Sequence, residues 1–268
     1  MSVFLSLLSA EGGCWLEPQR ISRDVERSEQ NPLLFVSDGS LHLIHSAQLV
    51  RDQADRDALD ASSNFSMQWT AVIRHQRLAL EGLDLSDPET WSAEAWSIPV
   101  DLFDDPAFCR NPPHPLENGH WLLPIYRSLE AGGAFGHDHS EMVRLDSSGQ
   151  CLDAPCAVPE STGRVHGSIV ASRDGKQLLQ FFRSRLADQI YRSVSADDGH
   201  TWSVPEPTPL PNNNSSIRAC RLASGRLAMI FNRFGFAPDT ASSDEQLEWG
   251  EARWPRTRWP LSIAISDD

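Results

Sequence analysis

The sequence predicts an all-β protein made of repeated four-stranded sheets. Three observations support this: a recurring hairpin pattern, its spacing, and a turn motif that follows one repeat. Each repeat is a short apolar strand, a two-residue turn that ends in glycine, and a second apolar strand. The four copies span residues 31–44, 113–125, 168–182 and 217–231. Asp-Gly and Asn-Gly turns predict type I′ hairpins, in which both central residues have a positive φ.

The spacing of the repeats predicts how they are assembled. The turn glycines are Gly39, Gly119, Gly175 and Gly225, and the last two intervals suit a four-stranded unit. The longer first interval contains a polar stretch, residues 51–63, which we interpret as an inserted loop. A hairpin cannot bury its apolar face alone, so the repeats must stack, sideways as a sandwich or radially as a β-propeller.

The outer half of the third repeat favours the propeller. Residues 189–195 read as a third strand, and the segment Ser195-Ala-Asp197-Asp-Gly199-His-Thr201-Trp202 follows it. Gly199 would supply a turn, Asp197 would accept hydrogen bonds from nearby backbone amides, and Trp202 would fill the gap between sheets. Degenerate copies occupy residues 84–91 and 8–15, and residues 261–268 end like the start of another copy. We therefore expect a single propeller domain over residues 1–268.

The motif Ser-x-Asp-x-Gly-x-Thr-Trp resembles the Asp-box of sialidases and related propellers. Residues 28–35, 121–127, 182–185 and 211–216 are similar to a bacterial sialidase-like (neuraminidase-like) BNR-repeat family, and the similarity runs through nearly the whole chain. The resemblance implies a six-bladed propeller in which the Asp-box is structural. It also implies a ring that is incomplete at both ends of this chain, with open blade edges able to self-associate.

Composition limits the classes of partner. The formal net charge is −14 and the sequence pI is about 5.0, which argues against a nucleic-acid partner. No stretch approaches the roughly 18 apolar residues of a membrane span, and the first ten residues lack the positive region of a signal peptide. The five cysteines are scattered and odd in number, which is typical of a reducing compartment. We expect a cytoplasmic protein with no cofactor.

The resemblance implies a glycoside hydrolase that acts on an acidic, carboxylate-bearing sugar. Such enzymes bind the carboxylate with an arginine cluster and use a tyrosine nucleophile, a glutamate and an acid/base aspartate. Arg127, Arg183 and Arg233 each lie eight residues after a turn glycine, so they are equivalent in the repeat. They are either an anion clamp, since the guanidinium fork matches a carboxylate, or surface arginines that lie over apolar side chains. Arg27 and Arg185 are further candidates.

Polar residues just before the first strands form a second set. Glu29, Gln30, Asn31, His166 and Asn214 would either line the mouth of the site or cap turns. His166 is the strongest single candidate, because a histidine titrates near neutral pH. Asp138, in a glycine-rich loop between His137 and His139, is the candidate acid/base, with Asp52, Asp55 and Asp57 as alternatives. Adjacent side chains rarely converge on one ion, so we expect no metal.

These considerations give one set of predicted site residues. The predicted catalytic residues are Asp138, His166 and Glu29. The predicted substrate-binding residues are Arg27, Gln30, Asn31, Arg127, Arg183, Arg185, Arg233 and Asn214.

The nucleophile is not identified. Tyr126 and Tyr191 are the two tyrosines, and both fall in predicted strands. In the family that the chain resembles, the nucleophile comes from the C-terminal blades, which implies that it lies outside these residues. Two other functions stay open: a non-hydrolytic carbohydrate-binding or polysaccharide-lyase propeller, and a protein-interaction propeller.

Overall fold

The computed structural model describes residues 1–8, 13–50, 68–128, 137–235, 246–249, 252–255 and 258–267. The chain forms two compact units. Unit 1 is Met1–Phe108 with Asp146–Gln150, and unit 2 is Cys109–Leu145 with Cys151–Asp268. The inserted loop expected at residues 51–63 lies outside the described residues. The single domain over residues 1–268 stays a prediction.

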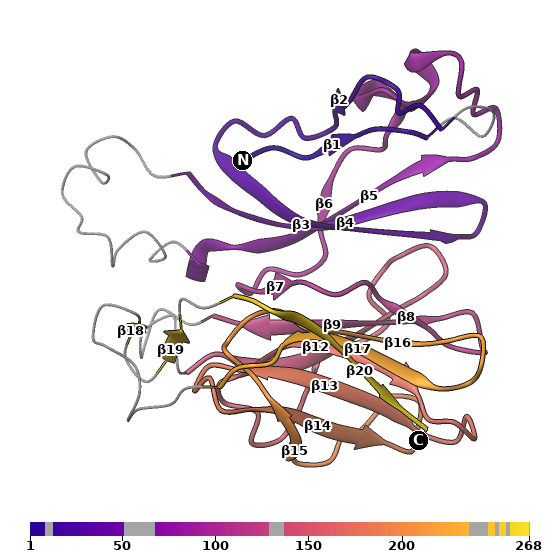
Figure 1. Cartoon of the computed structure of the whole chain (residues 1–268). Coiled ribbons are helices and arrows are strands. Elements are labelled where there is room, and N and C mark those ends of the chain that lie inside the picture. The colour runs from indigo at the N-terminus through magenta and orange to yellow at the C-terminus, as the bar shows by residue number, and fades with distance from the viewer. Residues whose placement is uncertain are drawn as a thin grey trace. The chain divides into compact units, whose positions relative to one another are not determined.

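Unit 1 is built on one four-stranded antiparallel sheet. Its strands follow chain order: β3 (Arg27–Ser37), β4 (Ser40–Leu49), β5 (Val72–Ala79) and β6 (Val100–Asp101) (Figure 1). A two-stranded sheet pairs β1 (Phe4–Leu5) with β2 (Gln19–Arg20). The described part of the unit also contains three short 3-10 turns: η2 (Gln68–Thr70), η3 (Pro88–Trp91) and η4 (Ala93–Ala95). Among the described residues, no helix is long and apolar enough to span a membrane.

Unit 2 carries three more sheets in succession (Figure 1). The first orders its strands as β11 (Cys156–Ala157), β10 (His139–Leu145), β9 (Trp121–Arg127) and β7 (Phe108–Cys109), and β8 (His114–Pro115) also pairs with β9. The second runs β12 (Arg164–Ala171), β13 (Leu178–Ser184), β14 (Gln189–Ser195) and β15 (Glu206–Pro211). The third contains β16 (Arg218–Arg221), β17 (Leu227–Asn232) and β20 (Leu261–Ser266).

The segment between β17 and β20 contains a separate hairpin, β18 (Gln246–Trp249) paired with β19 (Ala252–Pro255). β20 pairs with β17 on one side, and no strand of the described chain pairs with its other edge. Leu261 and Ile263 on this strand are about two-thirds exposed. The self-association expected from open blade edges stays a prediction.

All four predicted hairpins are confirmed. In three sheets the hairpin is the first two strands, and in the first sheet of unit 2 it pairs the two-residue β8 with β9. The turn type is confirmed in only one hairpin. Asp38 and Gly39 both have positive φ, as a type I′ turn requires. In the turns that end at Gly119, Gly175 and Gly225, the glycine alone has a positive φ. The type I′ prediction is therefore wrong for Asn118-Gly119 and Asp174-Gly175. In these two turns the glycine amide donates to the carbonyl three residues before it, that of Leu116 or Ser172. Side chains cap both turns: Asn118 accepts from the His120 amide at 3.0 Å and Asp174 from the Lys176 amide at 3.1 Å.

The Asp-box forms the predicted turn between β14 and β15. Asp197 Oδ1 accepts the Thr201 amide at 2.9 Å, Asp197 Oδ2 accepts the Thr201 hydroxyl at 2.6 Å, and Ser195 Oγ accepts the Gly199 amide at 2.9 Å. Gly199 has a φ of 82°, and a Cβ there would lie 2.5 Å from Leu122 Cδ1. The turn thus needs a glycine both for its backbone conformation and for space.

Trp202 of the Asp-box fills the space between two sheets. It packs with Leu122 and Met142 of the first sheet of unit 2, and with Ile169, Leu178 and Phe182 of the second. In unit 1, Trp91 of the degenerate copy at 84–91 lies in an equivalent cluster with Leu43, Leu78 and Trp96. Trp15 of the copy at 8–15 is instead 68% exposed and fills no such gap.

Two histidines form a buried pair in unit 1. His75 Nε2 lies 2.9 Å from His42 Nδ1, and their rings stack at 5.1 Å. His42 Nε2 lies 3.1 Å from the Ser37 carbonyl oxygen, to which it donates, so His42 Nδ1 accepts the His75 proton. Burial, with the neighbouring His42 and Arg77, lowers the pKa of His75 to about 4. A Cβ at Gly149 would lie 2.6 Å from the His75 ring, so a glycine is needed beside the pair.

Replacing Asp197 with alanine should destabilise the protein. Asp197→Ala removes both acceptors used by Thr201, and we expect the free energy of unfolding to fall by about 1–2 kcal/mol in urea denaturation. Asp198→Asn is the matched control: Asp198 has a φ of 54°, which asparagine tolerates, so its effect should stay within about 0.5 kcal/mol. Equal effects of the two variants would show that the Asp-box bonds do not stabilise the turn.

Lowering the pH should destabilise the protein through His75. Its folded pKa lies below the unfolded value of 6.5, so the unfolded chain binds more protons between pH 6.5 and 4. Stability is intact above pH 6.5 and falls as the pH is lowered through this window, by about 2 kcal/mol at pH 5. His75→Gln should reduce the difference in urea midpoint between pH 7.5 and pH 5, whereas His137→Gln, at an exposed position, should not. An unchanged difference in His75→Gln would assign the acid sensitivity to other groups.

Candidate functional site

Most of the predicted site residues lie in two groups of polar side chains, one in each unit. The unit 1 cluster contains Arg27, Glu29, Gln30 and Asn31, all on β3. The unit 2 cluster contains Asp138, His166, Arg183, Arg185 and Asn214, from one strand interior, one strand end and three loops.

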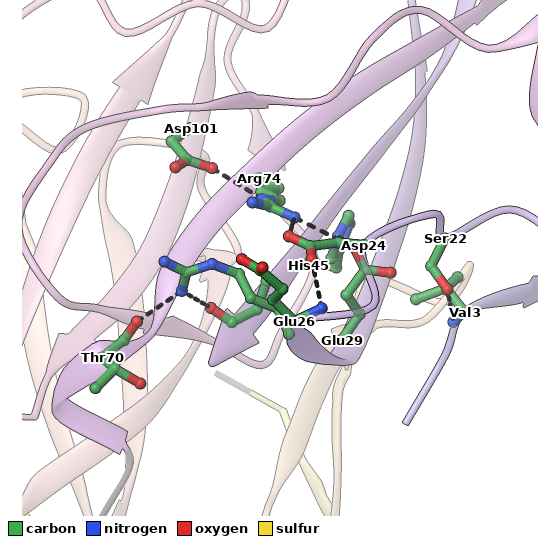
Figure 2. A network of polar contacts seen from close by, with 11 residues as sticks. Val3, Ser22, Asp24, Glu26, Glu29, His45, Thr70, Arg74 and Asp101 are labelled. Carbon is green, nitrogen blue, oxygen red and sulfur yellow. Dashed lines mark hydrogen bonds and ion pairs between the residues drawn. The ribbon is translucent and has the colours of Figure 1, made fainter. Parts of the chain in front are cut away.

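Glu29 is the centre of the unit 1 cluster (Figure 2). It is 2% exposed, and its Oε1 lies 3.3 Å from His45 Nε2 and 3.5 Å from Arg74 Nη1. Arg74 also binds Asp24 at 2.6 Å and Asp101 at 3.0 Å, so one guanidinium ties together three acidic side chains. Glu29 Oε2 has no hydrogen-bond partner among the described residues. A buried carboxylate oxygen in this state is a position where an ordered water or a ligand atom is expected.

The other predicted residues of unit 1 have backbone partners or backbone roles. Arg27 Nη1 donates to the carbonyls of Ala47 at 2.9 Å and Thr70 at 2.8 Å, which fixes its guanidinium against β4 and η2. The register of β3 shifts between Gln30 and Leu33, and Asn31 in this bulge has a φ of 57°. A β-bulge re-aims the side chains that it contains.

In unit 2, Asp138 and Arg185 form a buried ion pair. Asp138 Oδ2 accepts from Arg185 Nε at 2.9 Å and also from Arg185 Nη2. The two side chains are 0% and 3% exposed. Asp138 precedes β10 and Arg185 follows β13, so the pair joins the first two sheets of the unit.

Arg183 is buried beside this pair but has neutral partners. It is 8% exposed; its Nε donates to Asn214 Oδ1 at 2.8 Å, and its Nη1 lies 3.3 Å from His166 Nδ1. No carboxylate of the described chain forms an ion pair with it. Burial and the neighbouring Arg185 cation lower the pKa of Arg183 well below its usual range. Within the described part of the chain, Arg183 therefore has no carboxylate paired with it, and a bound anion would supply that negative charge.

His166 lies in a bulge of β12 and is neutral. The register shifts between Val165 and Ser168, and His166 has a φ of 58°, as Asn31 has in the bulge of β3. Burial and the cations of Arg183, Arg185 and Arg110 hold the pKa of His166 well below its usual value. A guanidinium can only donate, so Nδ1 accepts and the proton of neutral His166 is assigned to Nε2.

Asparagines hold the bulge and the arginine in place. Asn111 Nδ2 donates to the carbonyls of His166 at 2.9 Å and Gly167 at 3.0 Å. Asn214, with a φ of 57°, binds Arg183 through Oδ1 and donates through Nδ2 to the Arg253 carbonyl at 2.9 Å. Asn212 Oδ1 accepts the amides of Ser184 and Asn214, which ties the loop after β15 to the end of β13.

The structure adds two aromatic residues that the sequence analysis did not place in the site. The ring of Tyr126 lies 5.0 Å from that of His166 and 5.7 Å from the Arg185 guanidinium. Burial raises the pKa of Tyr126, with partial opposition from Arg185, so its hydroxyl keeps its proton. Trp254 of β19 also lies 5.7 Å from Arg185, and the Arg253 amide donates to the Arg185 carbonyl at 2.7 Å. Its position next to Arg127, at the end of the second strand of a repeat, was the feature of the sequence that could have placed Tyr126 in the site.

Arg127 and Arg233, the two arginines at the same repeat position as Arg183, have different surroundings. Arg127 Nε donates to Glu141 Oε2 at 2.8 Å, and Glu141 also lies 3.3 Å from His139 Nε2. Arg233 is exposed. Tyr191 packs at the edge of the cluster around Trp202, as expected for a third-strand residue, and donates to Asp188 at 2.8 Å. The alternatives Asp52, Asp55 and Asp57 lie outside the described residues.

A separate groove of about 880 Å³ lies between the second and third sheets of unit 2. Leu179, Phe181, Leu227, Met229 and Ala264 contribute to its mostly apolar lining. None of the predicted site residues lines this groove.

Comparison with known proteins agrees with this architecture. A family model described as a BNR repeat-like domain matches residues 1–268. No curated protein matches the sequence. A Dyadobacter fermentans protein of unknown function is 18% identical, with a TM-score of 0.59 over 85% of this chain and 64% of that one.

Two solved sialidases are also similar in structure. The sialidase Hz136, described as Hadza microbial, is 13% identical, with a TM-score of 0.61 over 86% of this chain and 46% of that one. The Trypanosoma rangeli sialidase in complex with sialic acid is 12% identical, with a TM-score of 0.61 over 96% of this chain and 40% of that one. The chain spans 40–64% of the length of these three structures. It has the predicted fold, that of a sialidase-like β-propeller, and it belongs to the family of BNR repeat-like domains.

Proposed function

We propose that this protein is a sialidase-like carbohydrate-active protein whose unit 2 site binds the carboxylate of an acidic sugar. One observation carries the proposal: Arg183 is a buried guanidinium whose contacts, Asn214 Oδ1 and His166 Nδ1, are both neutral. An uncompensated buried charge is costly, so a fold that keeps one has a reason to hold it.

The chemistry of the site suits a carboxylate. The guanidinium fork of Arg183 matches two carboxylate oxygens, and Asn214 fixes its orientation through Nε. His166 is neutral with its proton on Nε2, and Tyr126 keeps its phenolic proton, so both side chains are donors. A cation beside two neutral donors stabilises an anion. A sugar supplies the remaining hydroxyl groups that such a polar, asparagine-rich site can bind.

The similarity to known structures supports the sugar as ligand. One similar structure is a Trypanosoma rangeli sialidase in complex with sialic acid, a sugar that carries a carboxylate. At 12% identity this similarity concerns the fold, so the residue-level argument rests on Arg183 and its neighbours.

Hydrolysis of the acidic sugar is the fuller form of the proposal, and binding without hydrolysis is the second candidate. A specific observation favours the second candidate. Two buried or half-buried carboxylates of unit 2 are paired with candidate arginines, Asp138 with Arg185 and Glu141 with Arg127. A general acid or base must have an oxygen that can exchange a proton with the substrate, and each of these carboxylates has an oxygen that accepts hydrogen bonds from an arginine.

Replacing Arg183 with methionine should abolish binding of acidic sugars without unfolding the protein. Loss of a charge-assisted bidentate contact should weaken N-acetylneuraminic acid or glucuronic acid by about 10–100-fold in calorimetric titration. Arg192→Met is the matched control, because Arg192 is an exposed arginine on β14 of the same sheet, and it should change the affinity less than twofold. Because the variant removes an uncompensated buried charge, its urea midpoint should stay the same or rise.

Two results would contradict the proposal. One is that wild-type protein binds neither acidic sugar. The other is that Arg183→Met binds them as tightly as wild type does. Cleavage of a fluorogenic sialoside then separates the two candidates. Release of the fluorophore by wild type and not by Arg183→Met supports hydrolysis, whereas sugar binding without release supports the non-hydrolytic function.

A further inference from the structure

Asp138 lies beside Arg183 as the counter-charge of Arg185, and we propose that it sets the net charge of the site so that the site selects singly charged sugars over doubly charged ones. The inference rests on the proposed function and extends it by naming the class of anion. Asp138 is then a specificity-determining residue.

The charge count of the described site gives this result. Arg183 and Arg185 each contribute one positive charge, and Asp138 contributes one negative charge. His166 and Tyr126 are neutral in the folded protein. The buried groups therefore leave one positive charge, which a single carboxylate or sulfate ester neutralises. Arg110, the further cation that acts on His166 and Arg183, is exposed, so water and salt screen its charge. A phosphate monoester would carry a second negative charge into the same buried site with nothing to compensate it.

The Asp138–Arg185 ion pair is held rigidly and is shielded from solvent. One oxygen of Asp138 accepts two N–H groups of Arg185, and neither side chain is more than 3% exposed. Water cannot screen the pair, so its effect on a neighbouring ligand depends on the residues present and little on salt. Arg185 is held from the backbone as well, because its amide donates to the Gly163 carbonyl at 2.9 Å and its carbonyl accepts the Arg253 amide at 2.7 Å.

The test uses two ligands of almost the same shape and different charge. Glucose 6-sulfate carries one negative charge, and glucose 6-phosphate carries close to two at pH 8, since the second phosphate pKa is about 6. Both are measured as competitors of N-acetylneuraminic acid, and the readout is the ratio of their inhibition constants. Wild-type protein should prefer the sulfate ester by at least about tenfold.

Asp138→Asn should shift this ratio at least about tenfold toward the phosphate ester, because Arg185 then adds a second uncompensated positive charge. Asp153→Asn is the matched control. It breaks another arginine–carboxylate pair of unit 2, that with Arg144, and should leave the ratio unchanged.

A double variant separates charge from structural damage. Asp138→Asn with Arg185→Gln removes both members of the pair, so the site returns to one positive charge and the ratio should return to the wild-type value. It is also the test that remains if Asp138→Asn alone fails to fold, since replacing both partners avoids an unpaired buried charge. Damage to the site, by contrast, would make the double variant at least as different from wild type as the single one.

The outcomes distinguish this inference from the function on which it rests. If wild type binds no acidic sugar, the proposed function fails. If wild type binds N-acetylneuraminic acid but shows no preference between the two esters, or if Asp138→Asn keeps the wild-type ratio, the charge-setting role of Asp138 is overturned and the carboxylate site stands. A double variant that prefers the phosphate ester as the single variant does would also overturn it.

Discussion

The apolar faces of the hairpins are the constraint on which the rest of this structure depends. A two-stranded hairpin has too little surface to bury its own apolar side chains, so each must be covered by a neighbouring sheet. In unit 2 this contact is made by Trp202, which packs with Leu122 and Met142 on one side and Phe182 on the other. The Asp-box bonds hold the turn that delivers Trp202 to this place. A change that weakens this turn should therefore also weaken the packing between the two sheets.

Several of the candidate site residues lie where the hydrogen-bond ladder of a sheet is irregular. The bulges of β3 and β12 occur at equivalent points of two repeats and hold Asn31 and His166 with φ near 57°. A left-handed conformation is uncommon for any residue except glycine, although asparagine and histidine tolerate it better than most, and it persists where the surroundings enforce it. For His166 the enforcement is visible, because Asn111 binds the carbonyls of both His166 and Gly167. The bulge directs the imidazole of His166 toward Arg183. In a regular strand the side chain at this position would point in another direction.

The sequence was sufficient for the sheets and for part of the site. Hairpins with a turn glycine and the Asp-box are local patterns, and the structure has them at the predicted residues. The turn type was less predictable, since Asn118 and Asp174 act through side-chain caps and not through a positive φ. Arg183 and His166 were found because repeat offset and residue type both marked them. Repeat offset alone marked Arg127 and Arg233 equally, yet one of these pairs with Glu141 and the other is exposed. Ion pairing of this kind depends on which side chain lies across the sheet, and no local pattern records it.

The residues that the sequence analysis missed are explained by long-range placement. Trp254 belongs to a hairpin inserted between β17 and β20. It lies beside Arg185 because the amide of the preceding residue, Arg253, donates to the Arg185 carbonyl, and this backbone bond does not depend on the Arg253 side chain. Tyr126 has the pattern of a core strand residue, and it is buried; what gives it a polar role is its position beside Arg185 and His166. The same reasoning applies to the charge of the site. Two arginines separated by one residue look identical in sequence, but Asp138, 47 residues from Arg185, compensates one of them and leaves the other available. Under the proposed function, Arg185 is a structural cation and Arg183 is the cation that pairs with the ligand, because Asp138 forms its ion pair with Arg185 alone among the described residues.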